Sequence, residues 1–279
     1  MKFIFYSLFV TAILFSSCNK EEVQQTETGE KKCRISSVDM VYNPERSDKS
    51  GYFKGSAVVN YDEKYNIKSV VSVQDSAYKS FSVIYTPTQL TLKTKYNGDW
   101  IYKLNSQGMV NYIDLYEGGT KADIVYNTEG YISKLTRTDS YLEGSMVYSF
   151  IYADGNLTKV MGISTSGNRT ETIEYTYTKD LAVNLTSNAN PLYYLQIREV
   201  IPGFFGKVSN NQLSTVKQTS INLPYGNGYV LLYNYQYTKN GDNIILMKIN
   251  NIYHEVNPGL PNYVRFSVNS VYNFEYKCD

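Results

Sequence analysis

The chain repeats one short phrase: an aromatic or aliphatic strand residue, a tight polar turn, and a second run of strand-forming residues. The sharpest copy is residues 149–160, SFIYADGNLTKV, with Asp154 and Gly155 at the centre of the turn. Asp-Gly accepts the positive φ that a tight β-hairpin needs. Copies start near residues 61, 85, 104, 126, 152, 177, 207 and 237, at intervals of 19 to 30 residues. Intervals of this length are typical of one hairpin each, so the sequence predicts a repeated antiparallel structure.

Residues alternate in character within the predicted strands. In residues 171–179, Ile173, Tyr175 and Tyr177 share one face, and Glu174 and Thr176 share the other. This alternation is typical of a sheet with one face packed on the core and the other exposed to solvent. Eight turn centres imply about 14–16 strands, too many for an ordinary open twisted sheet. We therefore expect an all-β fold, a large up-and-down antiparallel meander curled into a closed or partly open barrel.

One stretch lacks this hairpin pattern: residues 190–206, NPLYYLQIREVIPGFFG. Asn190 can cap a helix, Pro191 suits its first position, and Pro202 stops it. The spacing predicts one short helix over 191–201. Because this helix is apolar on most sides, we expect it to plug or cap one end of the barrel.

The N-terminus has the pattern of an exported protein. Lys2 precedes an apolar run over residues 3–15, which is a signal peptide pattern too short to span a bilayer as a helix. The phrase FSSC ending at Cys18 resembles a bacterial lipobox, so residues 1–17 are expected to be removed and Cys18 acylated; the alternative is ordinary secretion with Cys18 as a free thiol. Residues 18–32 are polar and charged and predict a flexible leash. Residues 33–279 then form a single β-barrel-like domain.

Two further cysteines flank this domain, Cys33 and Cys278. In an exported protein they predict a disulfide that joins the first strand to the last. The alternative is two unpaired buried thiols. A zinc site is not expected, because a closed site needs four ligands and the chain has one histidine.

The turn phrases loosely resemble the YD repeats of shell-forming Rhs-type proteins. A closer resemblance is to a family of Bacteroidetes surface lipoproteins of unknown function with a porin-like β fold. It covers the lipobox, the leash, the tyrosine-rich hairpins, the segment 203–213 (GFFGKVSNNQL) and the closing strand that ends near Cys278. Residues 19–22 (NKEE) resemble the signal that sends such lipoproteins to the cell surface. The resemblance implies a lipid-anchored protein of the outer membrane, exposed at the cell surface, and it implies no activity.

The sequence contains few groups of residues that could form a catalytic site. His254 is the only histidine, and it has no recognisable serine or cysteine partner. The carboxylates Glu171 and Glu174 are three apart on a strand, so they point to opposite faces. The GxxGK phrase at Gly203 lacks the context of a phosphate loop and is interpreted as a structural connector. We expect no enzyme, no cofactor and no metal. The net charge of +1 argues against a nucleic-acid partner.

The excess of aromatic residues, including 29 tyrosines, is the one feature with a functional direction. Aromatic rings line apolar cavities and stack on sugar faces, although cross-strand pairs within a sheet explain most of them. The leading hypothesis is a binding protein for a glycan or lipid-like ligand. The alternatives are a structural or interaction protein accessory to an outer-membrane assembly and, less favoured, a membrane pore. The aromatic residues of the irregular stretches are the candidate ligand contacts: Trp100, Tyr193, Tyr194, Phe204, Phe205 and Tyr225.

Overall fold

The computed structural model describes the barrel strands, most of their connections and part of the 190–206 stretch. The described residues are 33–42, 53–64, 66–73, 80–94, 98–115, 119–140, 144–182, 191–195, 203–223, 225–256 and 263–278. The expected signal peptide, Cys18 and the leash lie outside these residues. The strands are β1 (Cys33–Tyr42), β2 (Phe53–Tyr61), β3 (Ile67–Ser72), β4 (Phe81–Thr86), β5 (Gln89–Thr94), β6 (Asp99–Leu104), β7 (Val110–Leu115), β8 (Thr120–Tyr126), β9 (Ile132–Asp139), β10 (Ser145–Ala153), β11 (Asn156–Ser164), β12 (Arg169–Leu181), β13 (Asn211–Asn222), β14 (Gly228–Asn240), β15 (Asn243–Val256) and β16 (Tyr263–Cys278).

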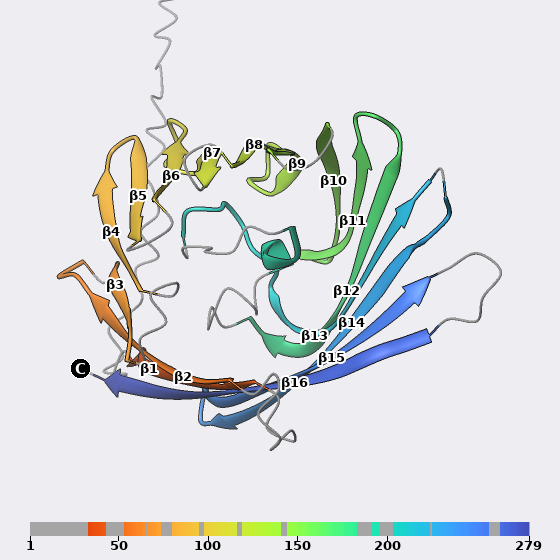
Figure 1. Ribbon diagram of the computed structural model, residues 1–279. Coiled ribbons are helices and arrows are strands. Elements are labelled where there is room, and N and C mark those ends of the chain that lie inside the picture. The colour runs from red at the N-terminus through yellow and green to blue at the C-terminus, as the bar shows by residue number, and fades with distance from the viewer. Residues whose placement is uncertain are drawn as a thin grey trace, which may run out of the picture. The chain divides into compact units, whose positions relative to one another are not determined.

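Each strand pairs antiparallel with its neighbours in sequence, and β1 pairs with β16 to close a barrel of 16 strands (Figure 1). The predicted all-β meander is confirmed, and of the two alternatives, closed or partly open, the barrel is closed. Alternate connections lie at opposite ends of the barrel. We call the end that holds Cys33, Cys278 and the turns after the even-numbered strands the turn end, and the other the loop end.

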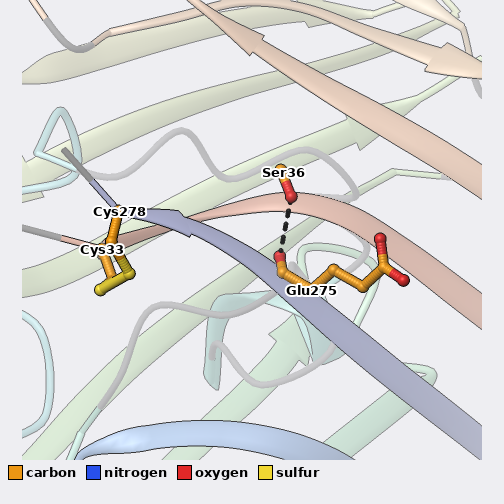
Figure 2. The surroundings of a disulfide bond; sticks show 4 residues. All are labelled: Cys33, Ser36, Glu275 and Cys278. Atoms are coloured by element: carbon orange, nitrogen blue, oxygen red, sulfur yellow. Dashed lines mark hydrogen bonds between the residues drawn. A yellow bond between two sulfur atoms is a disulfide. The ribbon is translucent and has the colours of Figure 1, made fainter.

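A disulfide joins Cys33 to Cys278, which face each other in the β1–β16 ladder. Beside it, Ser36 Oγ donates to the Glu275 carbonyl oxygen at 3.3 Å (Figure 2). Ser37 Oγ donates to Glu275 Oε2 at 2.7 Å. The disulfide therefore lies between β1 and β16, where the barrel closes. In the chain-entropy model, a cross-link over so long a loop stabilises the fold by about 5 kcal/mol.

The strands alternate between a buried inner face and a polar outer face. On β12, Ile173 and Tyr175 are buried and Tyr177 packs against the same core, whereas Glu174 and Thr176 are exposed, as predicted. Exposed charged residues on the outer face occur on strands around the wall: Asp39, Lys68, Lys93, Lys103, Lys121, Asp123, Lys134, Glu174, Lys217, Lys248 and Glu275. The interior is one continuous apolar cluster, rich in leucine, isoleucine and tyrosine.

The turns at the turn end follow two designs. Asp154 and Gly155 have φ values of 51° and 72°, which confirms the predicted tight hairpin between β10 and β11. Elsewhere an Asx residue organises the turn, since its side-chain oxygen accepts hydrogen bonds from the backbone two and four residues later. Asp62, Asn105 and Asn127 all do this.

The repeated tyrosines form a belt inside the turn end. We call the tyrosine belt the set Tyr61, Tyr85, Tyr126, Tyr152, Tyr177, Tyr237 and Tyr276, one near the end of every even strand except β6. Five of their hydroxyls donate to a backbone carbonyl near the start of the preceding strand: Ile35, Ile67, Val110, Leu157 and Ile244. Register shifts occur beside several belt residues, as at Val125/Tyr126 and Thr176/Tyr177. A bulge disrupts the ladder locally, and the hydroxyl satisfies a carbonyl there.

In the connection between β12 and β13, a 3-10 helix, η3 (Pro191–Leu195), lies inside the barrel (Figure 1). The sequence predicts a helix over 191–201, and residues 196–202 lie outside the described part. Tyr194 packs edge-on against Tyr175 and Tyr233. Residues 203–210 then cross the turn end, where Lys207 N donates to the Gly130 carbonyl oxygen at 2.9 Å. This segment makes the GxxGK phrase a connector, as expected.

At β6 the belt has Leu104 instead of a tyrosine, and the connection fills the position. Leu104 pairs with Val110, whose backbone N donates to the Phe204 carbonyl oxygen at 2.7 Å. The Phe204 ring lies 5.8 Å from the ring of Tyr85, and Phe205 packs edge-on against Tyr102. The gap in the repeat is therefore the place where the connection docks.

Candidate functional site

A buried polar group lies on the inner face of the loop half of the barrel. One cross-strand row brings it together: Tyr148 on β10 pairs with Gly162 on β11, Gly162 with Glu171 on β12, and Glu171 with Ser220 on β13. Gly162 is required because a Cβ there would lie 2.5 Å from Tyr148 Cε1. The Tyr148 ring can therefore lie across β11 and reach the next strand.

Glu171 is fully engaged by its neighbours. Its Oε2 accepts from the Tyr148 hydroxyl at 2.7 Å, and its Oε1 accepts from Gln218 Nε2. Glu171 is 4% exposed and Gln218 is 6% exposed. Burial, and then the negative charge of Glu171, raise the pKa of Tyr148 well above its usual value, so Tyr148 remains a hydrogen-bond donor.

Next to this row the wall becomes partly exposed. Arg169 Nε donates to Ser220 Oγ at 3.0 Å, and Ser220 faces Tyr229 across the β13–β14 ladder. The rings of Tyr229 and Tyr253 stack with centroids 5.8 Å apart and planes 24° apart. Burial, and then the charge of Glu171, raise the pKa of Tyr229. Arg169, Tyr229 and Tyr253 are partly exposed, unlike Glu171 and Gln218 behind them.

Asn251 lies two residues before Tyr253 on the same face of β15 and pairs with Tyr233. Its Oδ1 is buried and has no hydrogen-bond partner among the described residues. Such an acceptor costs about 1–3 kcal/mol unless a donor satisfies it. We call the following residues the loop-end cluster: Arg169, Glu171, Gln218, Ser220, Tyr229, Asn251 and Tyr253.

A second buried polar group holds η3 in place. Arg137 on β9 is 4% exposed, and its Nε donates to Asp139 Oδ2 at 2.8 Å while its Nη1 donates to the Leu195 carbonyl oxygen at 3.0 Å. Thr120 Oγ1 donates to Asp139 Oδ1 at 2.7 Å. Burial disfavours the charge on Arg137, but the carboxylate of Asp139 beside it helps to hold the pKa of Arg137 above its usual value, so the guanidinium stays charged. From the barrel wall, this group supplies a hydrogen-bond donor to the buried carbonyl at the C-terminal end of η3.

The six aromatic residues proposed from sequence do not form one surface. Trp100, Tyr194 and Phe205 are buried in the core, each less than 5% exposed, and Phe204 packs against Tyr85. Tyr225 is 75% exposed at the loop end, in the β13–β14 connection. Tyr193 lies in η3, and its side chain is outside the described residues. Tyr225 is thus the one of these six closest in sequence to the loop-end cluster.

The sequence analysis missed the loop-end cluster, although one signal was present. Glu171 shares its face with Ile173, Tyr175 and Tyr177, and a charged residue within an apolar row indicates a buried polar group. The expectation that Glu171 and Glu174 point to opposite faces is confirmed, since Glu171 is buried and Glu174 is exposed. His254 lies on the outer face, paired with Val230.

Among the described residues, no group of three or more histidine, cysteine, aspartate or glutamate side chains could hold a metal ion. No helix in that part of the chain is long and apolar enough to cross a membrane.

Comparison with solved structures places the barrel among porin-like folds. A porin-like protein from Bacteroides uniformis matches with a TM-score of 0.56 and 13% identity, over 87% of this chain and 96% of that chain. A porin-like protein from Bacteroides vulgatus matches with a TM-score of 0.48 and 10% identity, over 87% and 98%. No protein-family model matches the sequence, and no curated protein matches it. At 13% identity, the first likeness shows a shared porin-like barrel fold and carries no activity.

Proposed function

We propose that the protein is a lipid-anchored envelope protein whose barrel stands in water and binds a glycan or lipid-like ligand without catalysis. The observation that carries this proposal is the loop-end cluster, where polar groups converge beside two partly exposed aromatic rings on an inner wall. A few convergent polar groups within an apolar, aromatic lining are typical of small-molecule sites.

The polarity of the barrel wall supports a position in water. A membrane barrel has an apolar outer band and a polar interior, and a lysine on its lipid face costs about 2–4 kcal/mol at the midplane. Here Lys121, Lys134 and Lys217 are exposed on the outer face, and the interior is apolar and occupied by η3. This arrangement is the reverse of a pore.

The hydrogen bonds of the buried carboxylates support binding rather than catalysis. Both oxygens of Glu171 accept bonds from Tyr148 and Gln218, and both oxygens of Asp139 accept bonds from Thr120 and Arg137. A general acid or base must reach a proton of the substrate. Carboxylates whose two oxygens are both bonded to neighbouring side chains in this way act as structural acceptors.

The anchor part of the proposal rests on the sequence. Cys18 ends a lipobox-like phrase, and residues 19–22 resemble a surface-export signal. We propose that acylated Cys18 tethers the barrel to the outer membrane at the cell surface, with residues 18–32 as the leash. Metabolic labelling with an alkyne fatty acid tests this, since Cys18→Ala should abolish incorporation.

Native mass spectrometry and vesicle leakage test the function of the barrel. The Cys33–Asp279 chain, which contains the closed barrel, is exported behind a cleavable signal and purified without detergent. We expect a soluble protein that carries a reproducible bound mass and releases no dye from vesicles. Recovery only in detergent, or dye release, would contradict the proposal.

A second candidate function is an interaction protein, accessory to an outer-membrane assembly. One observation favours it: Val147 and Ile163 pair on the outer face of β10–β11, next to exposed Ile151 and Met161. Apolar patches of this kind mark protein contacts. A charged substitution, Ile163→Glu, should then abolish co-purification of an envelope partner crosslinked in cells, and it should leave the bound small-molecule mass unchanged.

A further inference from the structure

We infer that the loop-end cluster is a binding site for a neutral sugar in its pyranose form. This inference rests on the proposed function and deepens it, since it selects the glycan over the lipid-like ligand. The sugar would place an apolar ring face against Tyr229 and Tyr253, and its hydroxyls toward Arg169 and Asn251.

The two tyrosine rings form a partly exposed platform. In the core, Tyr102 and Phe205 meet edge to face at 83° and Tyr194 and Tyr233 at 61°, and a near-parallel pair among the described core rings, Tyr235 and Tyr237 at 13°, packs into the apolar cluster. Tyr229 and Tyr253 lie within 24° of parallel, come from neighbouring strands and are both partly exposed. A stacked pair keeps an apolar outer ring face with a polar rim, which suits the C–H face of a sugar.

Hydrogen-bonding capacity remains next to this platform. The Arg169 guanidinium makes one hydrogen bond with described residues, from Nε to Ser220, so its Nη groups remain available as donors. Asn251 Oδ1 is an acceptor without a partner in the described part of the chain. Sugar hydroxyls both donate and accept, and can therefore satisfy both groups.

The charges around the cluster favour a neutral ligand. The positive charge of Arg169 lies next to buried Glu171, and Glu255 pairs with Tyr229 across the β14–β15 ladder. An anionic headgroup or fatty acid would meet these carboxylates, and like charges at close range are unfavourable. An alkyl chain would leave the Asn251 acceptor unsatisfied.

Calorimetry with defined oligosaccharides tests the site. The Cys33–Asp279 protein is titrated with maltohexaose, cellohexaose, mannohexaose and xylohexaose, and with palmitate as the lipid-like probe. We expect binding of at least one oligosaccharide and none of palmitate. Tyr253→Ala should weaken that binding about tenfold or more. Arg169→Gln and Asn251→Ala, which leave the platform intact, should also weaken it.

The matched control is Tyr112→Ala, since Tyr112 is partly exposed on the outer face of β7 beneath Lys103. It should bind the sugar as the parent protein does, and circular dichroism checks that every variant folds. Sugar binding that survives Tyr253→Ala, Arg169→Gln and Asn251→Ala would overturn the site. Binding of palmitate and of no sugar would overturn the ligand class, while a retained bound mass would leave the proposed binding function standing. Loss of both sugar binding and bound mass would overturn both.

Discussion

The hydroxyl of Tyr177 lies 2.6 Å from the carbonyl oxygen of Leu157 and 2.9 Å from Ser209 Oγ. One tyrosine thus joins β12, β11 and the segment that crosses the turn end. This contact explains why a tyrosine recurs in the sequence repeat, because the hydroxyls of other belt tyrosines donate hydrogen bonds to the preceding strand in the same way.

Tyr177→Phe tests the tyrosine belt. The ring stays in place, but the Leu157 carbonyl loses its donor, so we expect the free energy of unfolding to fall by about 1–2 kcal/mol. Urea unfolding measures the change, and Tyr112→Phe on the outer face is the control. If the free energy of unfolding fell equally little in both variants, the belt hydroxyls would contribute nothing to stability.

Gly162→Ala tests the crossing of Tyr148 over β11. A Cβ at position 162 would lie 2.5 Å from Tyr148 Cε1, so the ring must move and release Glu171. We expect a loss of about 1–3 kcal/mol in the free energy of unfolding. In the double variant with Tyr148→Ala the two effects should be clearly less than additive. Additive effects would show that the two residues do not interact.

Arg137→Met tests how η3 is held. The substitution leaves Asp139 buried without its cation and removes the donor to the Leu195 carbonyl, so we expect a loss of about 3–5 kcal/mol. Lys134→Met lies on the outer face of the same strand and should change stability by less than about 0.5 kcal/mol. Similar urea midpoints for both variants would contradict the assigned role of Arg137.

Alkaline pH should destabilise the barrel through the belt. Burial, with a smaller contribution from Asp62, raises the pKa of Tyr85 to about 12, and burial raises those of Tyr126 and Tyr177 as well. An unfolded tyrosine ionises near pH ~10, so the folded state retains these protons longer. The contribution of these tyrosines to the free energy of unfolding is complete below pH ~10. It is lost as the pH rises toward their pKa values in the folded state, by about 1.4 kcal/mol per pH unit for each such tyrosine.

Urea midpoints measured between neutral and alkaline pH, together with tyrosinate absorbance, give this dependence. In Tyr85→Phe the alkaline decline should be shallower. An unchanged slope in that variant would contradict the contribution of Tyr85.

Local chemistry was enough to predict much of this fold. Asp154-Gly155 predicts its hairpin, the alternation around Tyr175 predicts the inner face, and Cys33 and Cys278 predict the closure. The loop-end cluster could not be predicted, because it depends on the register of β10 to β15, which places Tyr148, Glu171, Ser220 and Tyr229 in one cross-strand row. The burial of Phe205 likewise depends on where the β12–β13 connection docks, at the Leu104 gap in the belt.

Thiol labelling of the membrane-anchored protein tests most directly whether the outer wall faces water. Single variants Lys134→Cys, Glu174→Cys and Lys217→Cys introduce a thiol on the exposed outer face, and Ser164→Cys introduces one in the buried interior. With a membrane-impermeant maleimide on intact cells, we predict rapid labelling of all three outer variants and labelling of Ser164→Cys only after unfolding. Protection of the outer variants, relieved by detergent, would show that lipid covers the wall and would contradict the account.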